Sequence, residues 1–275
     1  MSMLGRDPVQ SCRRSRLAKP WRFDNRNTLK GLRLRLTGRG GYPHYRFQVG
    51  GRRFLYCYVR KNACSAFKEL ILHCHGAQVP PDVRPIDVMD DVARADGAAL
   101  RTGNDHVVMV YRDPVERIVS LYLNKMVQRV GAEDLLANYR QVTGTDPDGA
   151  SFDDFVTGYL RPQFGDLDLH AVPQRWHMLP IVYTDVISIR HLDRAMNGLI
   201  GPDLARRYFG RPVNQTRAET HVEDPDAWDK SAGRLHDVWR KTGVLPRPGG
   251  FRTPPIESRL RSLYAADYEL APAGA

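Results

Sequence analysis

The chain has 275 residues, of which 42% are hydrophobic, and this length can bury a substantial core as one large α/β domain or two small ones. No apolar run is long enough to cross a bilayer, and residues 1–22 carry charges without the apolar stretch of a secretory signal. We therefore expect a cytoplasmic protein. The four cysteines form no CxxC pair, and a chain of this size needs no disulfide framework.

The formal net charge of +10 is concentrated near the N-terminus. Residues 1–53 hold 14 Lys or Arg and 2 Asp or Glu, whereas the other 222 residues hold 27 and 29. Such a segment can contact nucleic acid, acidic lipid or an acidic glycan, or can be a solvated, partly disordered leader. We assign residues 1–28, which lack clear periodicity, to a basic N-terminal arm and residues 29–275 to a single α/β domain.

The first predicted elements are strands. Residues 32–36 alternate strictly between leucine and arginine, which is the period of a half-exposed strand. A second strand is predicted over 45–49, and the glycines within 38–41 and 50–51 indicate turns. We therefore expect an N-terminal β-hairpin or meander, followed by a buried strand over the apolar residues 54–59.

A basic loop joins this buried strand to a helix predicted over 64–76. The first N–H groups of a helix lack partners and carry a partial positive charge, so they can bind an anion. The small residues at 63–66 allow a phosphate to approach the backbone, and Ser65 adds a hydroxyl donor. Lys61 and Lys68 add positive charge. The pattern GxxxxGK[ST] is absent, so this loop is not a Walker A motif.

A second strand–loop–helix unit begins at residue 106. Residues 106–111 form a continuous apolar run, as expected for a buried parallel strand. The following helix has clear start signals, because Asp113 is a candidate N-cap with Pro114 at N1. Glu116 stands at N3, which completes the spacing of a capping box.

Arg112 and Ser120 are the candidate anion ligands of this second unit. Arg112 leaves the end of the strand, and Ser120 lies two helical turns after the N-cap, with Asn124 one turn further on the same face. A guanidinium and a hydroxyl can hold one phosphate between them. Two such units about 50 residues apart indicate one ligand with phosphates at two ends.

The remaining elements complete an α/β pattern. Alternation of strands and helices predicts a central parallel β-sheet flanked by helices. A short strand is predicted over 181–183, and residues 146–149 form a loop. Helices are predicted near 86–95, from Ser151 onward, and over 191–199, 227–240 and 256–266.

Both loops resemble segments of a known family. Residues 59–68 resemble the 5′-phosphosulfate-binding segment of sulfotransferases that use 3′-phosphoadenosine 5′-phosphosulfate (PAPS), and residues 111–125 resemble their 3′-phosphate-binding segment. The likeness is to the Golgi-type carbohydrate sulfotransferases and their bacterial relatives. It implies a P-loop-like three-layer fold and transfer of a sulfuryl group from PAPS to a hydroxyl, with 3′-phosphoadenosine 5′-phosphate (PAP) as product and without a metal.

The resemblance also implies site residues. Lys61 would stabilise charge on the leaving oxygen. The implied cofactor-binding residues are Lys61, Asn62, Ala63, Cys64, Ser65, Ala66, Phe67, Lys68, Arg112 and Ser120. His170 leads as the general base, because its segment also resembles the family and precedes a candidate acceptor wall. That wall is Gln174, Trp176 and His177. Weaker candidates for the base are His177, His75 and His73, and an Asp or Glu also remains open.

Neither a metal site nor a nucleic-acid site is favoured by the residues. His73, Cys74 and His75 are adjacent on a predicted helix and therefore cannot all face one ion. The acceptor is expected to be a carbohydrate or another hydroxyl compound, and the basic N-terminus can contact an acidic acceptor or a membrane surface. Two alternatives remain. One is an atypical P-loop kinase with Mg²⁺ on Asp113 or Asp185, and the other is a basic nucleic-acid-binding protein.

Overall fold

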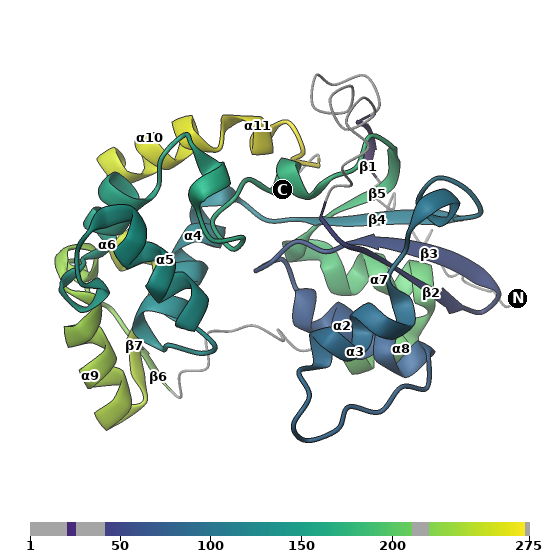
Figure 1. Ribbon diagram of the computed structural model, residues 1–275, viewed down its shortest axis with the longest axis horizontal. Coiled ribbons are helices and arrows are strands. Elements are labelled where there is room, and N and C mark those ends of the chain that lie inside the picture. The colour runs from purple at the N-terminus through teal and green to yellow at the C-terminus, as the bar shows by residue number, and fades with distance from the viewer. Residues whose placement is uncertain (1–20, 26–41, 211–219, 273–275) are drawn as a thin grey trace, which may run out of the picture.

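A five-stranded sheet organises the structure, a computed structural model that describes residues 21–25, 42–210 and 220–272 (Figure 1). The strand order is β1-β5-β4-β3-β2, and β3, β4 and β5 are parallel. β1 and β2 pair antiparallel at the two edges. The strands are β1 (Trp21–Asp24), β2 (His44–Val49), β3 (Arg52–Cys57), β4 (His106–Tyr111), β5 (Val182–Ser188), and the separate pair β6 (Thr220–Val222) and β7 (Val244–Pro246).

The predicted α/β fold with a mostly parallel central sheet is confirmed. The strand predicted over 106–111 has those bounds in β4, and the strand predicted over 45–49 is β2. β2 forms its hairpin with β3, across the turn at 50–51. The predicted strand at 32–36 lies outside the described residues. β5 is longer than the predicted 181–183, because it pairs with both β1 and β4.

Residues 21–24, which fall in the predicted basic arm, form the edge strand β1. Asp24 pairs with Val182 of β5, and the Arg175 guanidinium lies 5.5 Å from the centre of the Phe23 ring. Phe23 packs against the sheet face that contains Leu55. Four residues are too few to display a period, which is why the sequence gives no sign of this strand.

Helices cover one face of the sheet, where α2, α3, α7 and α8 bury the first core cluster (Figure 1). The opposite face is covered by short turns and by the chain after α11, through residues such as Met178 and Leu270. The helices are α2 (Cys64–Cys74), α3 (Pro85–Ala93), α4 (Pro114–Tyr122), α5 (Glu133–Thr143), α6 (Phe152–Asp154), α7 (Leu192–Ile200), α8 (Pro202–Phe209), α9 (Ala232–Thr242), α10 (Pro254–Leu263) and α11 (Ala265–Tyr268).

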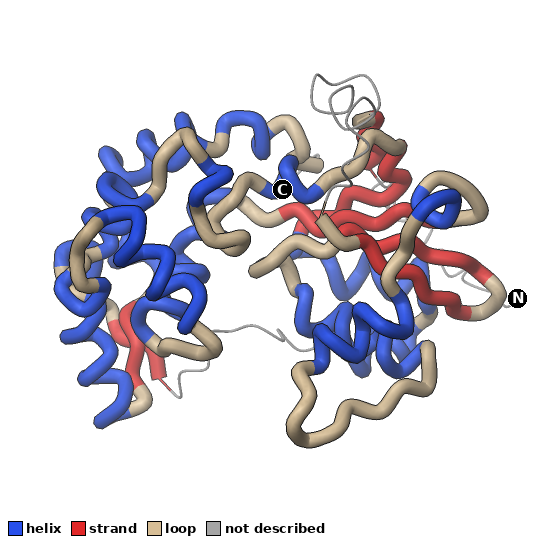
Figure 2. The backbone as a smooth tube through the Cα atoms, in the orientation of Figure 1, coloured by secondary structure: helices blue, strands red, loops and turns tan. Residues whose placement is uncertain are grey.

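A second group of helices packs beside the sheet around its own aromatic core. In Figure 2 this group is mostly blue tube and lies to one side of the red strands of the five-stranded sheet. Its core contains Tyr122, Phe152 and Phe155, which are fully buried, and the Tyr122 ring packs edge to face on both phenylalanine rings. α4 starts at the sheet and runs into this core. No helix in the described parts of the chain is long and apolar enough to span a membrane.

The N-cap of α4 follows the sequence signals, but its predicted capping box is incomplete. Asp113 Oδ1 accepts the Glu116 N–H at 3.1 Å, as predicted for an N-cap. The Glu116 carboxylate pairs with Arg190 and does not reach back to Asp113, so only half of the capping box forms. After Tyr122 the helix widens into a π-helical turn, Leu123–Val127. π-helical turns inside helices are frequent at functional sites.

Candidate functional site

The two predicted phosphate loops leave the same edge of the sheet. β3 and β4 are parallel neighbours, with Phe54 opposite His106 and Tyr56 opposite Val108. The loops that follow Cys57 and Tyr111 therefore emerge side by side. The carboxyl edge of parallel strands is where open α/β sheets bind ligands.

The first loop has a strained backbone and an open helix start. Lys61 has φ 70° and Ala63 has φ 58°, which is the left-handed region that non-glycine residues rarely adopt. Ala63 is the N-cap of α2 and makes no side-chain capping bond. The first-turn N–H groups, at Cys64, Ser65 and Ala66, are therefore left for an anion.

Lys61 points its amine toward the second unit. Its Nζ donates to Asn124 Oδ1 at 2.8 Å, from the π-helical turn that follows α4. Burial, together with the nearby charges of Arg112 and Lys125, lowers the pKa of Lys61 to about 7. A bound phosphate would favour the charged ammonium form, because an opposite charge at close range stabilises it.

Arg112 joins the two loops directly. Its Nη1 donates to the Lys61 carbonyl at 3.0 Å, and burial lowers its pKa to about 10. Its Nε is buried and has no hydrogen-bond partner among the described residues. Ser120 lies in α4 as predicted and is 7% exposed. Buried polar groups in proteins usually have a partner, so the guanidinium has capacity for a ligand.

Gln174 forms hydrogen bonds with both loops. Its Oε1 accepts from Asn62 Nδ2 at 2.5 Å and from the Arg112 N–H at 3.1 Å, while its Nε2 donates to the Arg112 carbonyl at 2.8 Å. The predicted acceptor wall is therefore wrong for Gln174, which is fully buried. His177 is fully buried too, whereas Trp176 is 37% exposed.

Arg117 is a site residue that the sequence analysis did not identify. It is fully buried, and its Nε donates to the Arg60 carbonyl at 3.2 Å. Its Nη2 donates to the His170 carbonyl at 2.9 Å, and Nη1 has no partner among the described residues. Its position three residues before Ser120 and seven before Asn124 places it on the predicted ligand face, and this spacing could have found it.

His170 lies at the same site, next to a carboxylate. Its Nδ1 is 2.6 Å from Asp168 Oδ1, and 22% of its side chain is exposed. Burial outweighs the opposing effect of the bond to Asp168 and lowers the pKa of His170 to about 4. The imidazole is therefore neutral at pH 7 and can accept a proton.

Other predicted residues lie elsewhere. Phe67 is fully buried in the core, and its ring stacks on Tyr56 with centroids 3.9 Å apart. Lys68 is one turn into α2, on a side where its charge acts on Asp87 of α3. Nothing in the structure brings these two side chains to the loop. Within the described residues, no group of three or more His, Cys, Asp or Glu is placed to hold a metal ion.

The aspartates that a kinase would need do not meet at the loops. Asp113 uses its carboxylate to cap α4. Asp185 is buried and pairs with His106 at 3.0 Å. His106 is the first residue of β4, so this pair lies at the amino end of the strand, away from the loops. The structure therefore gives no support to a Mg²⁺ site on either residue.

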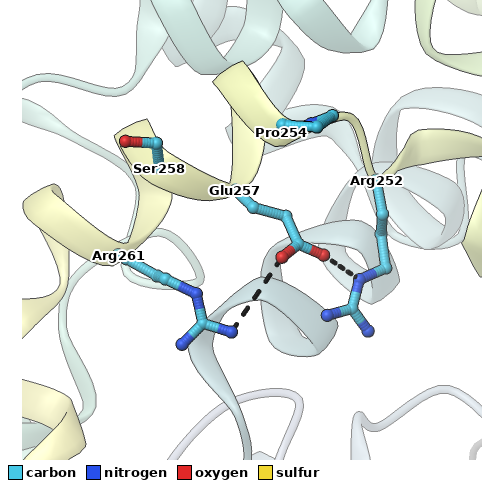
Figure 3. A pocket seen from close by; sticks show the side chains of 5 residues that line it. All are labelled: Arg252, Pro254, Glu257, Ser258 and Arg261. Atoms are coloured by element: carbon cyan, nitrogen blue, oxygen red, sulfur yellow. Dashed lines mark hydrogen bonds and ion pairs between the residues drawn. The ribbon is translucent and has the colours of Figure 1, made fainter.

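A separate pocket of about 490 Å³ opens beside α10 (Figure 3). Arg252 Nε lies 2.5 Å from Glu257, and Arg261 Nη2 lies 3.9 Å from the same carboxylate. Both guanidinium groups thus face one glutamate, which already balances part of their charge. None of the predicted site residues lines this pocket.

Comparison with known proteins points to one family. A family model described as "Sulfotransferase family" matches residues 47–194. Carbohydrate sulfotransferase 14 of Mus musculus is 35% identical over 135 residues, which is 44% of this chain and 36% of that protein. Its Homo sapiens counterpart is 34% identical over 118 residues, or 38% and 31%. The chain thus aligns with about a third of these relatives' length. No solved structure matches the chain.

Proposed function

Because the chain belongs to the sulfotransferase family, we propose that it transfers a sulfuryl group from PAPS to a hydroxyl of a carbohydrate. The observation that carries the proposal is the junction of the two loops, where the Arg112 guanidinium donates to the Lys61 carbonyl at 3.0 Å. Both curated relatives are carbohydrate sulfotransferases, which supports a carbohydrate acceptor.

The residues around this junction suit a ligand with phosphates at two ends. The open start of α2 and the Lys61 amine would hold the 5′-phosphosulfate, in the manner of a P-loop-like cradle without its glycines. Arg112, whose Nε lacks a partner, would hold the 3′-phosphate together with Ser120. PAPS has both groups.

The chemistry follows from the placement of charge. The acceptor oxygen attacks sulfur, and the bond from sulfur to the 5′-phosphate oxygen breaks, so negative charge grows on that oxygen. Lys61 and the first-turn N–H groups would stabilise this charge in the transition state. His170, neutral at pH 7 and partly exposed, would take the proton of the acceptor hydroxyl.

The test is calorimetric titration of PAP and AMP, which differ by the 3′-phosphate. We expect clear preference for PAP in the wild type. Arg112→Ala should weaken PAP binding by about 2–5 kcal/mol, roughly 30- to several-thousand-fold, since the phosphate loses its charged partner in a buried site. Ser120→Ala should cost about 1 kcal/mol. Arg190→Ala is the matched control, because the guanidinium of this exposed arginine pairs with Glu116 and with no other acidic group among the described residues.

Equal affinity for PAP and AMP in the wild type, or full selectivity in Arg112→Ala, would rule out the assignment of the second loop. A parallel activity assay addresses the kinase alternative. Transfer from PAPS is expected to continue in EDTA, whereas phosphoryl transfer from ATP that requires Mg²⁺ would favour a kinase.

A further inference from the structure

Asp168 and His170 form a tightly bonded pair beside the cofactor loops. Asp168 Oδ1 accepts from the His170 backbone N–H at 2.8 Å and lies 2.6 Å from His170 Nδ1. An ionised carboxylate only accepts hydrogen bonds, so Nδ1 carries the ring proton. Nε2 is then the nitrogen with the free lone pair, and no described residue hydrogen-bonds to it.

We propose that Asp168 is a positioning residue for sulfuryl transfer, which holds the His170 imidazole in the tautomer and orientation whose Nε2 takes the proton from the acceptor hydroxyl. This inference rests on the proposed function, in which His170 is the base. As the hydroxyl oxygen bonds to sulfur, its proton moves to Nε2, and the electron pair of the broken S–O bond leaves on PAP. Asp168 gains no proton but stabilises the imidazolium that forms.

A network behind Asp168 fixes its position. The Asp168 N–H donates to Asn138 Oδ1 at 2.9 Å and to the Tyr159 hydroxyl at 3.1 Å. Tyr159 in turn donates to Asn138 Oδ1 at 2.6 Å, and Asn138 Nδ2 donates to the Asp166 carbonyl at 2.9 Å. Asn138 comes from α5 and Tyr159 from the π-helical turn Phe155–Tyr159. Two helical elements therefore hold the backbone from which the carboxylate extends.

The same pair is tied to the donor loop by one guanidinium. Arg117 donates to the His170 carbonyl at 2.9 Å and to the Arg60 carbonyl at 3.2 Å. Arg60 directly precedes Lys61, so a single buried side chain sets the distance between the base and the phosphosulfate loop. A base that must act within hydrogen-bond reach of a reacting group needs this kind of placement.

Asp168 also counteracts the positive charges near His170. Burial lowers the pKa of His170, and Arg60 and Lys125 lower it further, whereas Asp168 raises it. Among these charges Asp168 is the anion, so without its carboxylate the pKa of the imidazole would fall and the ring would be a poorer base. The pKa of Asp168 lies below its ordinary value because the contacts with His170 outweigh its burial, so the carboxylate is charged at neutral pH.

A purely structural role for Asp168 would consist of its bond to the His170 backbone N–H. Asp168→Asn separates the two roles. The asparagine oxygen can still accept that backbone N–H, but it has no charge, and its amide can donate to Nδ1 and so favour the opposite tautomer. Asp166→Asn is the matched control. It removes the same charge two residues before Asp168, and the Asp166 side chain is 67% exposed.

The experiment combines kinetics with ¹⁵N NMR of the histidine rings. In Asp168→Asn we expect kcat to fall about 100-fold or more, with the affinity for PAP changed by less than about threefold. The His170 nitrogen shifts should move away from the Nδ1–H form, and the acidic limb of the kcat/KM profile should move to lower pH. Asp166→Asn should match the wild type in all three measurements.

Wild-type kcat in Asp168→Asn, or a lost kcat with an unchanged His170 tautomer, would overturn the proposal. If Asp168→Asn does not fold, the wild type still decides, since a His170 ring protonated at Nε2 at pH 7 would overturn it as well. Full activity in His170→Ala would do the same by removing the base. Failure of the wild type to prefer PAP over AMP would instead contradict the proposed function, and the NMR result would remain independent of it.

Discussion

Lys61 combines a left-handed backbone with a buried amine. Its φ of 70° turns the carbonyl toward the Arg112 guanidinium, while Nζ reaches Asn124. Strained residues of this kind persist where surrounding contacts over-determine them, commonly at ligand sites. One residue therefore contributes its carbonyl to the joining of the loops and its amine to the site.

Lys61→Ala should lower turnover more than donor affinity. The amine matters most when the leaving oxygen becomes anionic, so we expect kcat to fall by on the order of a hundredfold, with a smaller change in PAP affinity. Steady-state kinetics and PAP titration measure the two effects. Lys68→Ala is the control, because Lys68 lies one turn further along α2, near Asp87. A raised KM with normal kcat in Lys61→Ala would mean that Lys61 only binds.

Binding of PAP at pH 8 should take up a proton at Lys61. Burial lowers the pKa of Lys61 from 10.5 to about 7, so the free protein holds it mostly neutral at pH 8, and a bound phosphate favours the ammonium form. Calorimetry in two buffers with different ionisation enthalpies should give different heats, and Lys61→Met should abolish the difference. Equal heats in the wild type would contradict the prediction.

The lowered pKa of Lys61 also determines how the unfolding free energy depends on pH. Between pH 7 and 10.5 the unfolded chain binds more protons at Lys61 than the native protein does. The contribution of this group to the unfolding free energy therefore rises with pH across that window. The contribution of Lys61 therefore makes the native protein less stable near pH 7 than at pH 10, and a bound phosphate offsets the difference.

At the scale of elements, the segment that carries His170 is docked by buried hydrogen bonds to two other parts of the chain. Gln174 joins it to both cofactor loops. The Asp267 carboxylate of α11 accepts the backbone N–H groups of Gln174 and Arg175, both at 2.9 Å. α11 therefore holds the junction of the two loops in place through Asp267.

Gln174→Ala should destabilise the fold and weaken PAP binding together. The truncation leaves the Arg112 backbone N–H without its buried partner and removes one of the two acceptors of the Asn62 amide, at a cost of about 1–3 kcal/mol per group. Urea unfolding and PAP titration measure both effects. Gln163→Ala, on an exposed residue, should change neither. If Gln174→Ala is destabilised but keeps its PAP affinity, the hydrogen bonds of Gln174 contribute to folding alone.

For the whole molecule, β1 is the first strand among the residues that the structure describes. Deletion of residues 1–20 should leave PAP binding and thermal stability unchanged, because the site residues and β1 lie beyond it. Deletion of residues 1–25 removes β1 and Asn25, whose side chain donates to the Leu179 carbonyl at 2.8 Å. We expect a loss of about 2 kcal/mol, or roughly 4–8 °C in Tm.

Thermal unfolding with and without PAP tests both truncations. Equal Tm values for the two would show that β1 adds nothing to the sheet. A loss of PAP binding on deletion of residues 1–20 alone would contradict the placement of the cofactor site beyond the arm.

Local signals in the sequence determined the elements of the donor site. The apolar run at 106–111 is a buried strand, and Asp113 caps the helix that follows, because both depend on neighbouring residues alone. The loop at 60–63 could be predicted as an anion site for the same reason: a strand, small residues and a helix start are consecutive in the chain. The strand–loop–helix units and their order follow directly.

Only the tertiary structure decided which side chains meet across these units. Gln174 and Arg117 bind backbone groups that lie more than 50 positions away in the chain, and no local period reports such a pairing. Asn124, which accepts from the Lys61 amine, lies in the π-helical turn Leu123–Val127, and this partner is also distant in the chain. Short-range patterns specify secondary structure, whereas long-range hydrogen bonds depend on how the sheet brings its loops together.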